Sequence, residues 1–280
     1  MDSNELADFL TTLFLPNQAP STLHLRIRPR LYFDCVSSTN DIAKRIVSTS
    51  QHSVLIVAET QTNGRGRGGN TWFSTKGENL LFSLTLPPNI FHGGSLQPDL
   101  ITLITGLAVY ETLIPIFSHL PNSVRLKWPN DVLIHQKKVC GILVESLYQG
   151  NRLKSIIIGI GLNVNQQVFV TDIAERTTSL RCENGGQSLS RITILFDLLQ
   201  NLFKFIDQLS HSNSNRKEIL DSAINAMQIL HKPVNFIWKD AHMNGKIIGI
   251  SDEGKLCIQF LNGNIHILSQ NEIHSVNYFL

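Results

Sequence analysis

One glycine-rich segment of this chain carries the residue types that bind anions. Residues 64–69 read Gly-Arg-Gly-Arg-Gly-Gly and lie between two apolar runs. Glycines let the backbone approach a ligand closely, and Arg65 and Arg67 provide planar, permanently charged forks for carboxylate or phosphate oxygens. Trp72 adds an aromatic face just after the glycines. The pattern predicts a loop that an anionic ligand orders and closes.

Three other interpretations of this loop fit less well. A dinucleotide-binding fingerprint needs a helix after the glycines, whereas residues 70–84 have the pattern of a turn and a strand. An arginine-glycine tract for RNA would be longer, repeated and disordered. A plain hairpin loop explains the glycines but not both arginines, because such loops favour Asn, Asp or Ser.

Two further segments bring polar groups together. Residues 127–138 surround a rigid Trp-Pro turn with cations and oxygen-bearing side chains, namely Lys127, Asn130, Asp131 and Lys138. Residues 159–165, with the sequence GIGLNVN, end an apolar run with small residues and Asn163. Taken alone, the first segment is more typical of a surface hairpin with solvated charges, and the second of a strand interrupted by glycine.

Composition limits the possible functions. The chain has 280 residues, 42% hydrophobic and 16% charged, as expected for a protein with a substantial core. A net charge of +2 gives no strong global field for nucleic acid, so anion binding must come from a local cluster. No apolar run approaches the length of a membrane span. The four cysteines, Cys35, Cys140, Cys182 and Cys257, are far apart and predict buried, reduced thiols.

Hydrophobic periodicity predicts alternating strands and helices from residue 30 onward. Strands are expected at 30–36, 53–59 and 79–86, and within 123–146 and 153–165. Helices are expected within 37–50 with Ser38 as cap, over 97–120 with a kink or end at Pro115, over 189–209 with Ser190 as cap, and at about 216–227. Residues 210–215, SHSNSN, are expected to form a flexible joint.

The hydrophobic pattern of the sequence changes after Pro233. Short segments alternate at period two, with turns expected at Asn244-Gly245, at 252–254 and at Asn262-Gly263. Such strands predict a small barrel of SH3 type. The expected organisation is an N-terminal extension at 1–29, a catalytic domain at 30–228 and the barrel at 229–280. The acidic first residues argue against a targeting signal, and 29 residues are too few for a DNA-binding domain.

Together, the polar segments resemble the biotin protein ligases, or holocarboxylase synthetases, of the type without an N-terminal DNA-binding domain. Five stretches match in the family's order and spacing across about 130 residues: SSTN (37–40), ETQTNGRGRGGNTW (59–72), KWPNDVLI (127–134), KKVCGILVE (137–145) and GIGLNVN (159–165). The resemblance implies an α+β fold, in which a central mixed sheet with flanking helices, like that of class II aminoacyl-tRNA synthetases, precedes the SH3-like barrel.

The resemblance also implies a two-step reaction. Biotin and ATP with Mg²⁺ give biotinyl-5′-adenylate and pyrophosphate, and the acyl group then passes to a lysine of a biotin carboxyl carrier domain. Two anions must meet in the first step, so the expected task of the enzyme is neutralisation and alignment. The implied setting is cytoplasmic, with no DNA or membrane partner. Whether the protein forms a homodimer is left open, because some members of the family pair through their sheets.

Matching positions imply a role for each residue. Arg65, Lys138 and Asp131 would be catalytic, and Asp131 would also meet Mg²⁺ through water. Biotin would be bound by Ser38, Thr39, Gln61, Gly64, Arg65, Lys138, Gly141 and Gly159. ATP and the adenylate would be bound by Arg67, Trp72, Lys127, Asn130 and Asn163.

Three alternative functions compete with this one. A catalytically inactive scaffold that uses the C-terminal barrel for interactions is disfavoured by the complete charged set of Arg65, Arg67, Lys127 and Lys138. A lipoate ligase or octanoyl transferase has a similar fold, but that family's double-arginine, triple-glycine loop with a following His-Asp pair is absent from this sequence. An RNA-binding module that uses the glycine-arginine loop belongs to a different class, and salt-dependent binding of single-stranded RNA would distinguish it.

Overall fold

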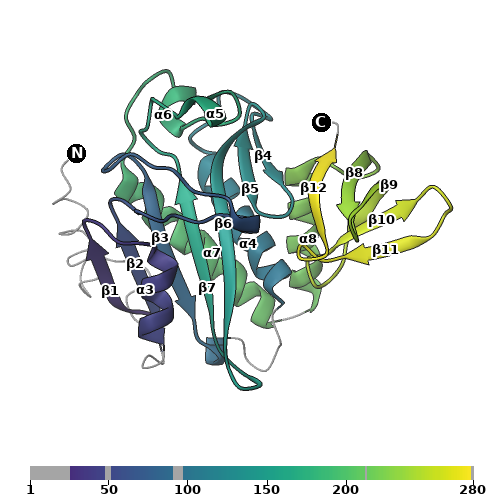
Figure 1. Ribbon diagram of the computed structural model, residues 1–280, viewed down its shortest axis with the longest axis horizontal. Helices are drawn as coiled ribbons and strands as arrows, with labels where there is room; N and C mark the ends of the chain where they lie inside the picture. The colour runs from purple at the N-terminus through teal and green to yellow at the C-terminus, as the bar shows by residue number, and fades with distance from the viewer. Residues whose placement is uncertain (1–25, 48–51, 91–96, 212, 279–280) are drawn as a thin grey trace.

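The computed structural model describes residues 26–47, 52–90, 97–211 and 213–278, and these form two sheets with helices around the larger one (Figure 1). The acidic N-terminus and its apolar segment lie outside the described residues. The larger sheet has the order β1-β2-β3-β7-β6-β5-β4, in which β1 is parallel to β2 and all other neighbours are antiparallel. Its strands are β1 (Ile27–Phe33), β2 (Ser53–Ala58), β3 (Leu80–Leu86), β4 (Val124–Lys127), β5 (Asp131–Ile134), β6 (Lys137–Gln149) and β7 (Arg152–Leu162).

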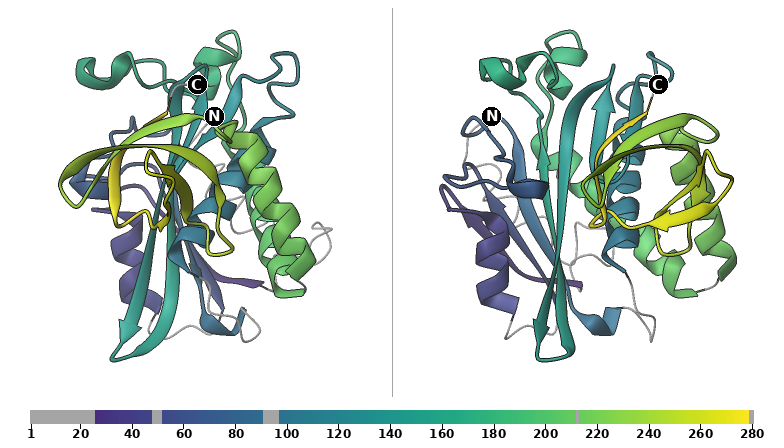
Figure 2. Two further views of the ribbon diagram at one scale, coloured as in Figure 1. Left: turned by 90° about the vertical axis from the view of Figure 1, so that its right-hand side faces the viewer. Right: turned by 45° about the vertical axis from the view of Figure 1, so that its right-hand side comes forward.

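Helices cover both faces of this sheet, which explains why β2 and β3 are buried along their whole length. Along β2, Leu55 and Val57 join the main core, whereas Val54 and Ile56 pack in a second cluster with α3 (Thr39–Ile46). The opposite face carries α4 (Pro98–Leu113), α7 (Arg191–His211) and α8 (Asn213–Met227), as Figure 2 shows from two sides. Two short helices, α5 (Thr171–Ala174) and α6 (Leu180–Glu183), follow β7.

The smaller sheet is antiparallel, with the order β11-β10-β9-β8-β12. Its strands are β8 (Pro233–Trp238), β9 (Ala241–Ile250), β10 (Leu256–Phe260), β11 (Ile265–Leu268) and β12 (Ile273–Tyr278). The α+β class predicted from the sequence is confirmed, with a C-terminal sheet of SH3-like character. Within the described residues, β11 and β12 are the edges and do not pair with each other, so the predicted barrel is not closed.

Several contacts attach the smaller sheet to the larger unit, and two of them involve Asp99 and Trp128. At the start of α4, the buried Asp99 carboxylate accepts hydrogen bonds from Gln270 N at 2.7 Å and from Ser269 Oγ at 2.9 Å. The buried Trp128 ring donates from Nε1 to Gly254 O at 3.2 Å. Gly254 has φ +83°, and a Cβ there would lie 2.6 Å from Leu100 N, so the close approach requires glycine.

Several predicted boundaries were wrong. The strand predicted at 30–36 runs over Ile27–Phe33, because Ile27 pairs with Ser53 and the chain leaves the ladder after Phe33. By contrast, the end predicted at Pro115 for the helix over 97–120 is confirmed, because α4 ends at Leu113 and proline cannot continue the hydrogen-bond pattern. Most of the predicted joint at 210–215 is helical, belonging to the end of α7 and the start of α8.

The turn predicted at Asn244-Gly245 is also wrong, because both residues lie inside β9. The reversal occurs instead at Lys239-Asp240, where both residues have positive φ. Gly245 is required by packing, because a Cβ there would lie 2.4 Å from Ile258 Cγ2 on β10. The glycine marks a close approach of two strands rather than a turn.

The expectation that all four thiols are buried holds for Cys140 but not for Cys35 and Cys182, which are exposed. Cys35 follows the end of β1, and Cys182 lies on the short α6, so neither is covered by a neighbouring layer. Burial raises the pKa of the Cys140 thiol above its ordinary value. Among the helices within the described ranges, none combines the length and apolar character needed to cross a membrane.

A buried ion pair closes the base of the glycine-rich segment. Glu59, fully buried after β2, binds Arg191 Nη1 at 2.7 Å, and the same nitrogen donates to Asn79 O at 3.1 Å. Tyr32 OH donates to the other oxygen of Glu59 at 2.9 Å, and burial, with this carboxylate, raises the Tyr32 pKa. One guanidinium therefore joins the two ends of residues 60–78.

We predict that Glu59→Gln lowers the free energy of unfolding by about 3–5 kcal/mol, because it leaves the Arg191 charge buried without a countercharge. Urea denaturation measures the change. As a control, Lys44→Gln removes the partly exposed Lys44–Glu145 pair and should cost under about 1 kcal/mol. Equal effects of the two substitutions would show that the buried pair does not hold the loop base.

Candidate active site

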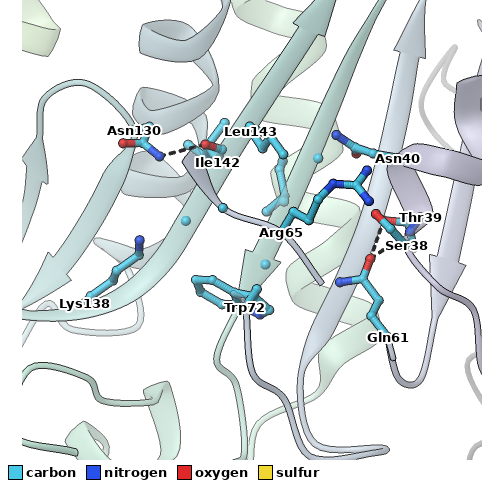
Figure 3. Close-up of a pocket in the computed structure, with 15 residues that line it drawn as sticks. Ser38, Thr39, Asn40, Gln61, Arg65, Trp72, Asn130, Lys138, Ile142 and Leu143 are labelled. Carbon is cyan, nitrogen blue, oxygen red and sulfur yellow. Dashed lines mark hydrogen bonds between the residues drawn. The ribbon is translucent and has the colours of Figure 1, made fainter. Parts of the chain in front are cut away.

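Two adjoining cavities lie on the face of the larger sheet under the glycine loop, and Figure 3 shows the smaller of them. The smaller, of about 40 Å³, is lined by Ser38, Thr39, Asn40, Gln61, Arg65, Gly66, Trp72, Asn130, Lys138, Gly141, Ile142, Leu143, Gly159, Ile160 and Gly161. The larger, of about 550 Å³, is lined by Asn70, Thr71, Trp72, Phe73, Lys127, Asp131, Leu133, Gln136, Lys138, Asn163, Phe169, Ile173, Arg176 and Thr177. Trp72 and Lys138 line both cavities and mark their junction.

Neutral hydrogen-bonding groups form one end of the smaller cavity. Ser38 precedes the first turn of α3, so Ser38 and Thr39 face the sheet beside β2. Gln61 Oε1 accepts from Thr39 N at 2.8 Å and lies 3.2 Å from Thr39 Oγ1. The buried Asn40 is bonded to Glu145 and Ser83, at 2.7 and 2.6 Å. These groups are held rigidly and suit a polar, uncharged ring.

Arg65 crosses the same cavity from the glycine loop. Its Nη1 and Nη2 bind the two Asp41 carboxylate oxygens at 2.9 and 2.5 Å in a bidentate pair. The hydrogen bonds from Arg65 hold the pKa of Asp41 below its ordinary value, and the pair raises the pKa of the guanidinium. The arginine is therefore fixed and charged at the edge of the cavity.

Lys138 brings a second cation to the junction. Its ammonium lies 2.7 Å from Asp131 Oδ1 and 5.5 Å from the centre of the Trp72 ring. Backbone bonds on both sides of the residue, Lys138 N to Arg176 O and Thr178 N to Lys138 O, hold the strand against the segment after α5. Arg65 and Lys138 thus place two cations on one small cavity whose lining contains no carboxylate among the described residues.

The Trp72 ring lies close to the backbone of two paired strands. Gly141 on β6 and Gly161 on β7 are partners in the ladder. A Cβ at Gly161 would lie 2.4 Å from Trp72 Cε2, and one at Gly141 would lie 2.7 Å from Cζ3. No larger residue fits at either position. Trp72 Nε1 is buried without a hydrogen-bond partner in the described part of the chain, so a ligand oxygen would satisfy a costly orphan donor there.

The larger cavity combines charge with apolar surface. Lys127, Arg176 and Lys138 supply cations, and Phe73, Phe169 and Ile173 supply apolar groups, as a nucleotide requires. Asn163 donates from Nδ2 to Thr178 O at 3.0 Å, and within the described structure its buried Oδ1 has no partner. Asp131 is the one carboxylate among the described residues that line either of these two cavities.

Arg67 lies apart from both of these cavities. Its Nη2 donates to Gln270 O in the smaller sheet, and burial lowers its pKa. It lines a third cavity of about 500 Å³, between the glycine loop, the start of α4 and Gln270. In this structure the residue predicted to bind phosphate links the loop to the C-terminal sheet.

Most of the predicted site residues meet around the two adjoining cavities. Ser38, Thr39, Gln61, Arg65, Trp72, Lys127, Asn130, Asp131, Lys138, Gly141, Gly159 and Asn163 line one or both. Arg67 does not. Gly64 lines neither, since its close neighbour is the backbone of the loop itself, where a Cβ would lie 2.6 Å from Trp72 O. The roles of all these residues toward ligands stay predictions.

Two predicted residues have structural partners that explain their type. The Asn130 side chain donates to Ile142 O at 2.9 Å. A Cβ at Gly159 would lie 2.4 Å from Asn40 Oδ1, so this glycine makes room for Asn40. The sequence interpretation assigned no role to Asn40, Asp41, Leu143 or Arg176, although Asn40 is part of the SSTN match.

Comparison with known proteins agrees with this arrangement. A model of the biotin/lipoate A/B protein ligase family matches residues 32–163. A bifunctional ligase/repressor BirA from Bacillus spizizenii is 33% identical over 239 residues, which cover 83% of this chain and 70% of that one. The chain belongs to the biotin/lipoate A/B protein ligase family.

Two further relatives extend along most of the chain. A biotin–[acetyl-CoA-carboxylase] ligase from Mycobacterium tuberculosis is 29% identical and matches over 84% of this chain and 85% of its own length. A biotin protein ligase from Aquifex aeolicus, solved in complex with biotin and ATP, superposes with a TM-score of 0.75 at 29% identity, over 90% of this chain and all of that one. The family resemblance seen in the five motifs is confirmed.

We predict that Gly159→Ala destabilises the protein by about 1–3 kcal/mol, because the added methyl group overpacks a dense site and displaces Asn40 from its buried hydrogen bonds. Urea denaturation measures it. Gly66→Ala is the control: Gly66 has φ −107°, and a Cβ there meets its nearest neighbour at 3.5 Å, an ordinary contact. A Gly159→Ala variant as stable as Gly66→Ala would contradict the packing argument.

Proposed function

We propose that this protein is an ATP-dependent biotin protein ligase. The observation that carries the proposal is the junction at Lys138. There a small cavity with fixed neutral hydrogen-bonding groups adjoins a larger one with cationic and apolar groups. The relatives with matching lengths are biotin ligases, and a solved relative is a complex with biotin and ATP.

The smaller cavity is the proposed biotin site. Ser38, Thr39 and Gln61 face the ring, and Gly141 and Gly159, whose missing side chains make room for Trp72 and Asn40, form the wall of the site along the sheet. Since ligand sites usually measure about 300–1,000 Å³, the smaller cavity alone does not hold biotin. The proposal therefore requires that this cavity enlarge when the ligand enters.

The larger cavity is the proposed nucleotide site. Lys127 faces the phosphates, Trp72 packs against adenine, and Asn163 reaches the adenylate through its unpartnered oxygen. Asn130 supports the cavity wall through Ile142. The assignment of Arg67 to phosphate requires that it leave Gln270, and Gly64 would contribute through its backbone.

Neutralisation is the main catalytic task in the first step. The biotin carboxylate attacks the α-phosphorus of ATP, and pyrophosphate leaves, so negative charge accumulates where the two cavities meet. Arg65 on one side and Lys138 on the other stabilise this charge in the transition state. Asp131 holds the Lys138 ammonium in place at 2.7 Å.

Magnesium enters with the substrate as Mg·ATP. The described residues contain no cluster of His, Cys, Asp and Glu that would hold a metal ion without phosphates. Mg²⁺ commonly binds through substrate phosphates and one or two carboxylates, and Asp131 is the carboxylate that faces this cavity.

In the second step the amine of the acceptor lysine attacks the acyl carbon, an amide forms and AMP leaves. The acceptor is a biotin carboxyl carrier domain of a carboxylase, in line with the named substrate of the Mycobacterium tuberculosis relative. The acceptor lysine must lose a proton, and we assign Asp131 as the base that takes it. A homodimer and a cytoplasmic setting remain parts of the proposal.

Pyrophosphate exchange tests this function. Purified protein with biotin, Mg·ATP and labelled pyrophosphate should produce labelled ATP, and only when biotin is present. Lipoate and octanoate in parallel reactions test the sister activity, and binding of single-stranded RNA tests the RNA-binding alternative. A folded protein that exchanges with lipoate or octanoate but not with biotin, or with no acid at all, would refute the proposal.

Variants test the cations. Arg65→Ala and Lys138→Ala should each lower kcat/KM for biotin adenylation by about 10²–10³, the effect of removing one donor from a charge-stabilising site. Lys76→Gln is the control, because Lys76 pairs with Asp34 on the surface and lines neither cavity. Wild-type rates in both alanine variants would contradict the proposal that Arg65 and Lys138 stabilise charge in the transition state.

A further inference from the structure

Asp41 is the residue that decides where the Arg65 guanidinium points. It lies in the first turn of α3, beside Thr39 and Asn40, and both of its carboxylate oxygens bind Arg65. Both side chains are about two-thirds buried or more, with 32% of Arg65 and 27% of Asp41 exposed. A bidentate pair of this kind fixes direction as well as distance.

The loop backbone does not need this pair to keep its shape. Trp72 N donates to Gly64 O at 2.9 Å, and Gly66 N donates to Asn70 O at 2.7 Å. Arg65 and Thr71 form an isolated antiparallel β-bridge. These bonds place the Arg65 backbone, but they do not fix the rotamer of its long side chain. The contact with Asp41 therefore orders the side chain rather than the loop.

The pairing leaves part of the guanidinium available. Asp41 binds the end of the fork through Nη1 and Nη2. A guanidinium has further N–H groups along its side, including Nε, and these can bind a second oxygen acceptor in the same plane. One arginine can thus hold Asp41 and a substrate carboxylate at the same time.

We propose that Asp41 is a positioning residue that orients the Arg65 guanidinium for the carboxylate of the substrate acid. This inference rests on the proposed function and adds a residue to its biotin site. Asp41 does not touch the substrate. Its effect should appear only for a ligand that carries the negative charge, because the neutral ring end binds elsewhere, at Thr39 and Gln61.

Calorimetric binding of two ligands, without ATP, separates this role from a structural one. Biotin carries the carboxylate, and biotin methyl ester keeps the ring system without the charge. Asp41→Ala should weaken biotin binding by about two- to tenfold, the cost of ordering one flexible side chain on binding, and should leave the methyl ester unchanged. Asp41→Asn, which keeps the shape of the side chain, should show a smaller change in the same direction.

The matched control is Lys44→Gln. Lys44 lies on the same helix and forms an ion pair of similar exposure with Glu145, but Lys44 does not line either cavity. The Lys44→Gln variant should bind biotin and biotin methyl ester as the wild type does. In an Arg65→Lys background, which lacks the planar fork, Asp41→Ala should have no further effect on biotin.

Each other result overturns the inference. Equal weakening of both ligands would mean that Asp41 supports α3 and not Arg65. Tighter biotin binding would mean that Asp41 competes with the substrate carboxylate. Unchanged binding would mean that Arg65 needs no partner. If the wild type binds neither ligand, the proposed function fails instead, which is a separate outcome.

Discussion

The close approach of the Trp72 ring to the backbone of β6 and β7 is the constraint on which this site depends. Only because Gly141 and Gly161 are partners in the ladder can an indole lie against the sheet at that point. The ring fixes the end of the glycine loop and separates the two cavities. A side chain on either glycine would lift the ring, and the loop with it, away from the sheet.

The electrostatics follow from this geometry. The loop brings Arg65 to one side of the ring, and β6 brings Lys138 to the other, 5.5 Å from the ring centre. Their countercharges, Asp41 and Asp131, lie on α3 and β5. Cations that are already ordered by protein carboxylates lose little freedom when they meet a ligand. The site is thus prepared for two anions that would otherwise repel each other.

The C-terminal sheet makes direct contacts with the larger unit and with the glycine loop. Asp99 and Trp128 hold it against the larger unit, and Gln270 O accepts from Arg67 of the glycine loop. The loop is therefore in contact with both sheets. This arrangement gives the small sheet a physical connection to the site, although it supplies no lining residue to the two adjoining cavities in the described structure.

Local patterns in the sequence were sufficient for much of the fold. Strands β2 and β3 are buried along their whole length because both faces of the sheet are covered, and Pro115 explains the end of α4 within a few residues. Ser190 caps α7 as predicted, with Thr193 N bonded to its Oγ at 3.3 Å. The order of the five motifs also identified the family, because residue types that must bind one ligand leave a fixed pattern along the chain.

What the sequence left undecided was which distant groups meet. Gly245 is a residue type typical of turns, but it lies inside a strand because Ile258 of the neighbouring strand β10 leaves no space for a side chain there. Arg67 has the chemistry for phosphate but binds a carbonyl some 200 positions away, and Asp41 resembles an ordinary first-turn acid until Arg65 folds against it. The sequence by itself determined the elements, the family and the candidate residues, since these depend on local propensity and residue type. Only the tertiary structure decided the partners, because a charged side chain takes its role from whichever oxygen the fold brings within hydrogen-bonding distance.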